Sequence, residues 1–341
     1  MTERERVERA ITFGGPDRIP MWIWHLPAAM TKLGDGLRDL YKEFPSAIQN
    51  IGFGGGPRRP ETVREETPEG GRYVDEWGCE WTERVPGIVG IVSRHPLDDW
   101  GKLDTYEMPD YIGWGDFDRV GQAIEDIEGE PFRLGAVGNF FERMQWVRGF
   151  ENLMFDLMDR RPEVYELRDR MLEHSLRLIR AWKDYDVEGL TFADDWGSQT
   201  NLLIPPDIFR EFFKPCYAAM FEEVHGQGKK VFLHSDGQII SIVEDLIEVG
   251  VNLLNAQITI MDWDEWMERF GGRLCLHCDL DRQHILPHGT PEDVRRHIAD
   301  IIRTFARPEG GLVGGGEIGA EVPLENARAV FEGYGELGTV K

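Results

Sequence analysis

Apolar runs long enough to cross a membrane are missing from this 341-residue chain, which has no stretch of 18 consecutive apolar residues. Cysteine is also scarce: the chain has four, Cys79, Cys216, Cys275 and Cys278. The chain starts with a charged segment, and no signal peptide precedes the first predicted elements. These features disfavour a membrane protein and a disulfide framework, and they predict a protein of the reducing cytoplasm.

Basic residues are too few to balance the acidic ones. Lysine and arginine total 38 against 62 aspartates and glutamates, a net charge of −24. This balance disfavours a nucleic-acid-binding or anionic-membrane-binding surface. At 41% hydrophobic residues the chain can bury a large core without disulfide or metal cross-links. Its length allows two or three domains, and a single barrel with additions fits equally well.

The first part of the chain, residues 1–130, is irregular and rich in glycine, proline and tryptophan. Within it, Met1–Phe13 reads as an amphipathic helix, and Arg18–His25 predicts a buried first strand. The segment Tyr73–His95 predicts a hairpin with a Pro86–Gly87 turn.

Residues 131–341 follow a regular alternation of short apolar runs and helical stretches. The expected strands are 132–140, 189–196, 230–237, 251–257, 273–281 and 311–319. The expected helices are 162–185, 206–227, 238–249, 261–270, 291–305 and 323–337. We therefore expect an α/β fold, a (β/α)8 TIM-type barrel with N-terminal helical and hairpin embellishments, in one domain spanning residues 1–341.

Polar side chains close nearly every predicted strand. In a (β/α) barrel the carboxyl ends of the strands share one face, so these residues should converge on one mouth. The strand-end residues are His25, Asn139, Asp194, Asp195, His234, Asp236, Asn255, Gln257, His277, Asp279, Asp281 and Glu317.

His234 and Asp236 form the sharpest local pattern. Two residues apart on a strand, they point to the same side and can reach one ion or one substrate. A strand-end histidine bonded to a loop is the structural alternative for His234. The pair Asp194–Asp195 could hold a cation, a metal or a shared proton, or could cap a helix.

Other residues near the strand ends are candidates for substrate contact. Cys278 could be a soft metal ligand or a packing residue, and the tryptophans could wall an apolar pocket or pack in the core. The predicted substrate-binding residues are His25, Trp24, Asn139, Trp196, Gln257, His277 and Asp279.

Three segments of the chain resemble the uroporphyrinogen decarboxylase superfamily. They are IPPDIFREFFKPCYAAMFEEVHGQGKKVFLHSDGQI, DLDRQHILPHGTPEDVRRHI and EVPLENARAVFEGY, and the similarity runs from Met1 to the C-terminus. The resemblance implies a distorted (β/α)8 barrel. It also implies either the porphyrinogen decarboxylase of haem synthesis or a methyltransferase that exchanges methyl groups with a corrinoid protein.

Two departures from the family pattern separate these branches. The decarboxylase carries paired arginines after its first strand, whereas this chain has no arginine between Arg18 and Arg38. The methyltransferases bind zinc through a His-x-Cys motif and a later cysteine. Here His234 and Asp236 occupy the motif, and the later position falls at Gly316, beside Glu317. The resemblance therefore implies a harder metal set from His234, Asp236 and Glu317, with Cys278 as a further candidate.

The resulting expectation is a methyltransferase that moves a methyl group between a small substrate and a corrinoid protein. His234, Asp236, Asp194 and Asp195 are the predicted catalytic residues, with zinc or another divalent metal as cofactor. A homodimer is compatible with this expectation. The alternative is a decarboxylase of a carboxylated pyrrole or aromatic, and a third possibility is a metal-storage barrel without catalysis. Arginines in the mouth, such as Arg133, Arg143 or Arg148, would favour the decarboxylase.

Overall fold

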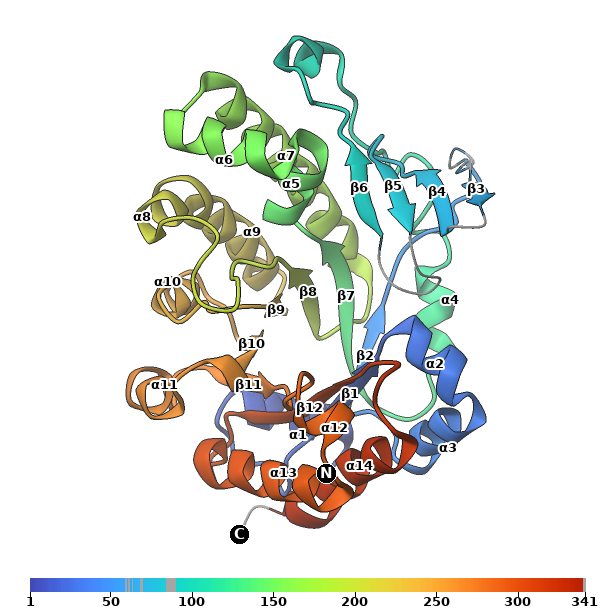
Figure 1. Ribbon diagram of the computed structural model, residues 1–341, viewed down its shortest axis with the longest axis vertical. Helices are drawn as coiled ribbons and strands as arrows, with labels where there is room; N and C mark the ends of the chain where they lie inside the picture. Colours follow the sequence, from blue (N-terminus) through green and yellow to red (C-terminus); the bar gives the residue numbers. More distant parts are fainter. Residues whose placement is uncertain (59, 61, 63, 68–69, 84–89, 340–341) are drawn as a thin grey trace.

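A computed structural model of the chain describes residues 1–58, 60, 62, 64–67, 70–83 and 90–339 (Figure 1). Eight parallel strands form a nearly closed barrel in the order β1-β12-β11-β10-β9-β8-β7-β2. The predicted TIM-type fold is confirmed. The barrel strands are β1 (Met21–His25), β2 (Ile48–Ile51), β7 (Phe132–Gly138), β8 (Gly189–Ala193), β9 (Lys230–Ser235), β10 (Leu253–Ala256), β11 (Cys275–Cys278) and β12 (Leu312–Ile318).

The barrel wall has one seam, between β1 and β2. A hydrogen bond from the Ala47 amide to the Met21 carbonyl, 2.8 Å long, joins the amino-terminal ends of these strands. Beyond it the described residues form no β1–β2 ladder, because β1 pairs with β12 and β2 pairs with β7. The two strands thus do not pair with each other toward their carboxyl ends, where the Ile23 carbonyl of β1 accepts instead from the Tyr41 hydroxyl at 3.2 Å.

The outer helices largely follow the predicted pattern. Pro291–Phe305 was predicted to the residue as α13, and Thr290 caps it as expected. The helix expected at 238–249 is shorter, and 206–227 contains a π-helical turn at Phe209–Phe213. The helices of the regular part are α5 (Phe141–Arg148), α6 (Phe150–Asp159), α7 (Pro162–Ala181), α8 (Pro206–Ile208), α9 (Lys214–Gly226), α10 (Val243–Glu248), α11 (Trp263–Phe270), α12 (Ile285–His288), α13 and α14 (Leu324–Leu337).

The N-terminal part adds helices, a second sheet and one barrel strand that the sequence analysis missed, β2. Its helices are α1 (Glu3–Ile11), α2 (Pro27–Leu33), α3 (Asp35–Glu43) and α4 (Val120–Glu125). The antiparallel sheet contains β3 (Arg64–Thr67), β4 (Gly70–Val74), β5 (Glu80–Glu83) and β6 (Ile91–Arg94), and it projects from the barrel in Figure 1. The predicted hairpin is its β5–β6 pair, and the Pro86–Gly87 turn lies outside the described residues.

The amino-terminal half of the barrel interior is apolar. Phe232, Leu253, Cys275 and Val313 point inward from β9 to β12 and pack with the buried face of α1. Side chains alternate across a strand, so residues two and four positions further along also point inward, closer to the mouth. We call the apolar cluster around these four side chains the floor. Among the described residues, none of the helices has the length and apolarity needed to cross a membrane.

Candidate metal centre

His234 lies on the inward face of β9, two residues beyond Phe232 of the floor. Across the sheet, the register places it beside Asn255 of β10, and Asn255 beside His277 of β11. The Trp24 ring from β1 contacts both imidazoles, with ring centroids 5.7 Å from His234 and 5.0 Å from His277. These four side chains form a layer directly above the floor.

Asn255 determines which nitrogen of His234 is free. The Asn255 amide nitrogen donates to the His277 carbonyl oxygen at 2.9 Å, so its amide oxygen must face the Nδ1 of His234. That oxygen can only accept, and Nδ1 therefore carries a proton. In the neutral ring, Nε2 then keeps its lone pair and is directed toward the mouth carboxylates. Asn255 thus holds His234 in the form that can bind a metal.

Two carboxylates face the Nε2 atom of His234. Asp195, after β8, places Oδ1 at 3.5 Å, and Asp236, after β9, places Oδ1 at 3.9 Å. Burial alone would lower the pKa of His234, but these carboxylates and the bond to Asn255 outweigh it, so that the pKa is raised. Burial raises the pKa of Asp195. One ligand atom from each of the three residues lies within 4.8 Å of the others.

The backbone fixes the two carboxylates relative to each other. The Asp236 amide donates to Asp195 Oδ1 at 2.9 Å. After Asp236 the chain turns at Gly237, whose φ is +85° and which packs against the backbone of Gly197. A Cβ atom there would lie 2.1 Å from the Gly197 carbonyl, so only glycine fits.

Arg282 is the cation of this mouth. Its guanidinium bonds to Asp236 Oδ2 and, at 3.2 Å, to Glu317 Oε1. Burial raises the pKa of Glu317, while the charge of Arg282 acts against that rise. Glu317, predicted as a ligand from the sequence, is therefore bound to Arg282, and Asp195 takes its place beside His234.

Asp279 and His277 continue the inward face of β11. Asp279 is 1% exposed, and neither carboxyl oxygen has a hydrogen-bond partner among the described residues. Burial raises the pKa of Asp279 to about 7 and lowers that of His277 to about 3. The His277 ring stacks on Trp22 with 4.8 Å between centroids. His277 is therefore a neutral packing residue, while Asp279 is a buried acceptor beside the mouth.

Asp194 has a different role from its neighbour Asp195. It is 1% exposed, and its carboxylate accepts from the Phe140 and Glu142 amides at 3.0 and 2.9 Å and from the Tyr217 hydroxyl at 2.5 Å. Burial raises the pKa of Asp194 to about 6, against the effect of these bonds. The structure thus makes Asp194 a support for the start of α5, which corrects its assignment as catalytic.

Three further predicted substrate contacts are bound within the protein. His25 points outside the barrel, with Nδ1 2.9 Å from the Tyr41 hydroxyl. Trp196 is fully buried and stacks on Phe141 with centroids 4.0 Å apart. Gln257 accepts from the Gly237 amide at 3.1 Å. We therefore assign these three residues to the framework of the site.

Asn139 lies beside the mouth, after the end of β7. It donates a hydrogen bond to Glu142 on α5. Burial, together with the charges of Asp195 and Asp194, raises the pKa of Glu142 to about 8. Asn139 thus holds, close to the two aspartates, a carboxyl group whose pKa is raised.

Cys278 does not point toward the metal-binding groups. Cys275 belongs to the inward floor, whereas Cys278 is fully buried in the outer core between the barrel wall and its helices. Burial raises its pKa well above the usual thiol range. Its assignment as a ligand is wrong because the two cysteines are three positions apart, which places them on opposite faces of β11.

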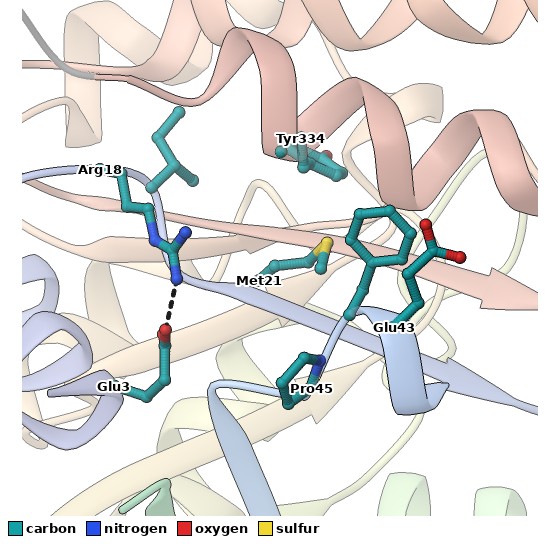
Figure 2. A pocket seen from close by; sticks show the side chains of 9 residues that line it. Glu3, Arg18, Met21, Glu43, Pro45 and Tyr334 are labelled. Carbon is teal, nitrogen blue, oxygen red and sulfur yellow. Dashed lines mark hydrogen bonds and ion pairs between the residues drawn. The ribbon is translucent and has the colours of Figure 1, made fainter. Parts of the chain in front are cut away.

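Of the arginines considered from the sequence, Arg18, Arg133 and Arg148 lie away from the mouth, whereas Arg143 lines a cavity with Asn139 after the end of β7. Figure 2 shows Arg18 bonded to Glu3 beside Met21, at the amino-terminal end of β1. Arg133 pairs with Glu188 at the start of β7, and Arg148 is buried against Asp156. Arg143 pairs with Asp75 and stacks on Trp77 and Trp146. They do not form a cluster for a polycarboxylate.

Two residues of the site were absent from the predicted set, Arg282 and Asn255. Asn255 is a strand-end polar residue, and its register beside His234 could be inferred only once the strand order was known. Arg282 follows Asp279-Leu280-Asp281 in one of the segments that carry the family resemblance. Its position three residues after an inward-facing aspartate is the available signal.

The donor set fits a divalent metal. Imidazole nitrogen with two carboxylates suits zinc or a harder divalent ion, and one nitrogen and two oxygens leave positions open for a substrate. Asp236 Oδ1 is buried without a hydrogen-bond partner among the described residues, as expected for an atom oriented toward a missing ligand. Asp195, His234 and Asp236 are therefore the residues that would hold the ion.

A family match and the structure of a methyltransferase agree with this architecture. The family model described as uroporphyrinogen decarboxylase (URO-D) matches residues 90–336. Among solved structures, a methyltransferase from Methanosarcina mazei is 18% identical with a TM-score of 0.74, covering 98% of this chain and 99% of that one. A chitinase from Chromobacterium violaceum is 9% identical with a TM-score of 0.42, covering 93% and 99%. No curated protein sequence matches.

Proposed function

We propose, from the premise that the chain belongs to the uroporphyrinogen decarboxylase family, that it is a metal-assisted methyltransferase. In this proposal it moves a methyl group between a small substrate and a corrinoid protein. The observation that carries the proposal is the group formed by Asp195, His234 and Asp236 at the carboxyl ends of β8 and β9. The four cysteines are free and buried, which suits the reducing cytoplasm where we place the protein.

Each residue of the site would have its own role. Asp195, His234 and Asp236 would hold zinc or another divalent ion, which acts as a Lewis acid on the heteroatom that carries the methyl group. Asn255 would keep Nε2 of His234 available, and Arg282 would hold Asp236 and Glu317 in place. Asp279, buried without a described partner, would accept a hydrogen bond from the substrate.

The corrinoid protein would dock over the carboxyl ends of the strands. Methyl transfer requires its cobalt to come within bonding reach of the methyl carbon, and the triad lies on this end of the barrel. The partner supplies the cobalt chemistry, while this chain supplies position and charge.

Decarboxylation of a porphyrinogen is the less favoured alternative. A buried carboxylate without a cationic partner costs several kcal/mol. Among the described residues, the arginine bound to the mouth triad is Arg282, and it is already paired with two carboxylates. We expect no useful turnover of uroporphyrinogen.

Metal content and methyl transfer together test the proposal. Purified protein would be analysed for bound metals, then incubated with reduced cobalamin and a panel of methyl ethers, methylamines and methyl thiols. We expect about one divalent ion per chain and methylcobalamin formation from one class. His234→Ala should abolish both, whereas His284→Ala, at an exposed side chain, should change neither.

Two results would count against the proposal. One is a protein that binds no stoichiometric metal and whose activity survives His234→Ala. The other is coproporphyrinogen formation from uroporphyrinogen at an enzymatic rate without any cobalamin methylation, which would favour the decarboxylase.

A further inference from the structure

A cavity of about 310 Å³ lies at the carboxyl end of β7, between this strand, α7 and the antiparallel sheet (Figure 1). This volume is at the lower end of the range of small-molecule sites. Residues 137–139 form its barrel wall, and the turn that joins β4 to β5 supplies a further side. We call it the β7 cavity. Because the carboxyl ends of the strands form the mouth, the β7 cavity lies on the same face of the barrel as the metal-binding triad.

Along the sheet, the side chain between the edge of the β7 cavity and His234 is a methyl group. Gly138 pairs with Phe192, so the next residue, Asn139, lies beside Ala193, and Ala193 pairs with His234. Neighbouring strands are about 5 Å apart, which puts the backbone of Asn139 about 10 Å from that of His234. An elongated small molecule held at one end in the β7 cavity therefore reaches the triad with its other end.

The charges of the triad act at the edge of the β7 cavity. Asn139 lines the cavity and donates a hydrogen bond to Glu142. Burial raises the pKa of Glu142 to about 8, the charge of Asp195 adds to this rise, and the charge of His234 acts against it. Interactions between charges weaken with distance, so the cavity edge lies close to the triad.

Arg143 is the cation that lines the β7 cavity. Its guanidinium is stacked on two indoles, 4.8 Å from the Trp77 ring and 4.4 Å from the Trp146 ring. Its Nη1 atom donates to Asp75 Oδ2 at 3.1 Å. Among the described residues, Asp75 is its one hydrogen-bond acceptor. The remaining N–H groups of this guanidinium are therefore available to a ligand.

Asp75 leaves room for a second carboxylate at this guanidinium. It accepts from the amides of Trp77 and Cys79 at 3.0 and 2.8 Å and from the Trp81 indole at 2.9 Å. The turn after β4 thus holds Asp75 in place, and the contact with Arg143 uses one carboxylate oxygen. An arginine that makes two parallel bonds to a carboxylate needs two nitrogens, which Arg143 still has.

Ring faces and an uncharged imidazole make up much of the remaining lining. Phe53, Trp77 and Tyr111 supply the aromatic surface. Burial lowers the pKa of His174 to about 4, so that its ring carries no charge near neutral pH. The Glu76 carboxylate accepts from the Tyr111 hydroxyl at 2.8 Å and so has a partner within the wall. The chemistry fits a single aromatic ring that carries a carboxylate.

We propose that the β7 cavity binds the part of the substrate that does not react, an aromatic ring whose carboxylate pairs with Arg143, and that it directs a methyl ether past Asn139 to the triad. Arg143 is then the specificity-determining residue. The inference rests on the proposed function for the methyl ether and its reaction. In that reaction the methyl–oxygen bond breaks with its electron pair left on the oxygen, and the reduced corrinoid supplies the pair for the new cobalt–carbon bond.

Calorimetric binding of small probes tests the site without any activity. The probes are 4-methoxybenzoate and the longer 3-(4-methoxyphenyl)propanoate, the neutral 4-methylanisole and the cationic 4-methoxybenzylammonium. We expect at least one carboxylate to bind about tenfold or more tightly than the neutral probe, and the cation to bind most weakly.

Two matched substitutions assign this preference to one guanidinium. Arg143→Gln should remove it. Arg168→Gln should not, although the Arg168 side chain is similarly buried, 18% exposed against 16% for Arg143, and also stacks on two rings outside the cavity. Equal affinity for carboxylate and neutral probes, or a preference that survives Arg143→Gln, would overturn the proposal.

A substitution that fills the β7 cavity tests the site if Arg143→Gln does not fold. Ser175→Leu places a larger side chain into the cavity from α7 and leaves the guanidinium in place. It should weaken the binding of every probe by about tenfold or more, because the ring and the new side chain compete for one space. Unchanged binding of the carboxylate probes in Ser175→Leu would overturn the proposal.

Methyl-transfer kinetics link the β7 cavity to the reaction. Arg143→Gln should raise the KM for the preferred carboxylate probe by about tenfold and leave the KM for reduced cobalamin unchanged. The product should be the phenol with its carboxylate retained. A protein that binds the probe through Arg143 but transfers no methyl group would retain the site and lose the proposed function. An active protein whose KM for every methyl ether is unchanged in Arg143→Gln would lose the site and retain the function.

Discussion

The floor and the mouth of the barrel are built by the same strands, two to four residues apart, yet they contain opposite chemistry. On β10, Leu253 belongs to the floor and Asn255 holds His234, although both side chains point inward. On β11, Cys275 is followed on the same face by His277 and Asp279. Helix α1 covers the floor, and the carboxyl ends of the strands form the mouth. The division agrees with the general rule that the amino-terminal face of such barrels supports stability and the carboxyl-terminal face chemistry.

The largest expected effect comes from the floor. Leu253 is 1% exposed, so Leu253→Ala should lower the free energy of unfolding by about 2–5 kcal/mol through lost burial and a cavity. Metal affinity of the folded protein should not change. Chemical denaturation and metal titration would measure the two quantities. Weakened metal binding by a folded Leu253→Ala protein would break the separation of floor and mouth.

Substitutions of Asp194 and Asp195 should likewise affect different properties, stability for Asp194 and metal binding for Asp195. Asp194→Ala leaves two amides and the Tyr217 hydroxyl without their acceptor and should cost about 3 kcal/mol of stability. Asp195→Ala removes a side chain that is 40% exposed, and should change stability by less than about 1 kcal/mol while weakening metal binding. Thermal and chemical unfolding of both variants would decide. Equal stability losses would mean that Asp194 and Asp195 do not have these separate roles.

Asn255 should affect metal affinity by holding the ligand His234. Asn255→Leu removes the acceptor for Nδ1 of His234, and the change should lower metal affinity by about 10- to 100-fold. Competition with a chromophoric chelator would give the affinity. Asn201→Leu, at an exposed side chain, is the control. Wild-type affinity in Asn255→Leu would show that the histidine needs no orienting bond.

Replacing Arg282 should have the smallest effect on metal affinity, and it should raise the affinity instead of lowering it. Its guanidinium is bound to Asp236, so Arg282→Gln removes a positive charge beside the proposed ion. Metal affinity should rise by up to about tenfold. The rise should shrink at high ionic strength, because screening weakens interactions between charges. A large fall in affinity would instead make Arg282 necessary for holding the carboxylates.

Most of the fold follows from patterns along the chain, and most of the site depends on contacts between strands. The apolar runs and capped helices from residue 131 onward predict barrel strands and outer helices, and α13 matches to the residue. The strand β2 was missed because it has four residues and no alternating pattern that distinguishes it from the surrounding loop. That the chain forms one domain over residues 1–341 stays a prediction.

The candidate site contains residues that the sequence analysis named, but the structure divides their roles differently. His234, Asp236 and Asp195 were all named, but the division between Asp194 and Asp195 depends on Tyr217 and the start of α5, far away in sequence. Glu317 was assigned to the metal because its pairing with Arg282 becomes visible only in three dimensions. Cys278 was misplaced although it follows His277 directly, because side chains that are adjacent on a strand point to opposite faces.

Anomalous X-ray scattering from crystals of the zinc-loaded protein tests the central claim most directly. We expect one strong peak at the zinc edge, about 2.0–2.2 Å from ligand atoms of Asp195, His234 and Asp236, and no peak in the floor. Crystals of His234→Ala, loaded in the same way, should lack it. A zinc-soaked wild-type crystal without a peak at these three residues, or with its ion elsewhere, would contradict the account.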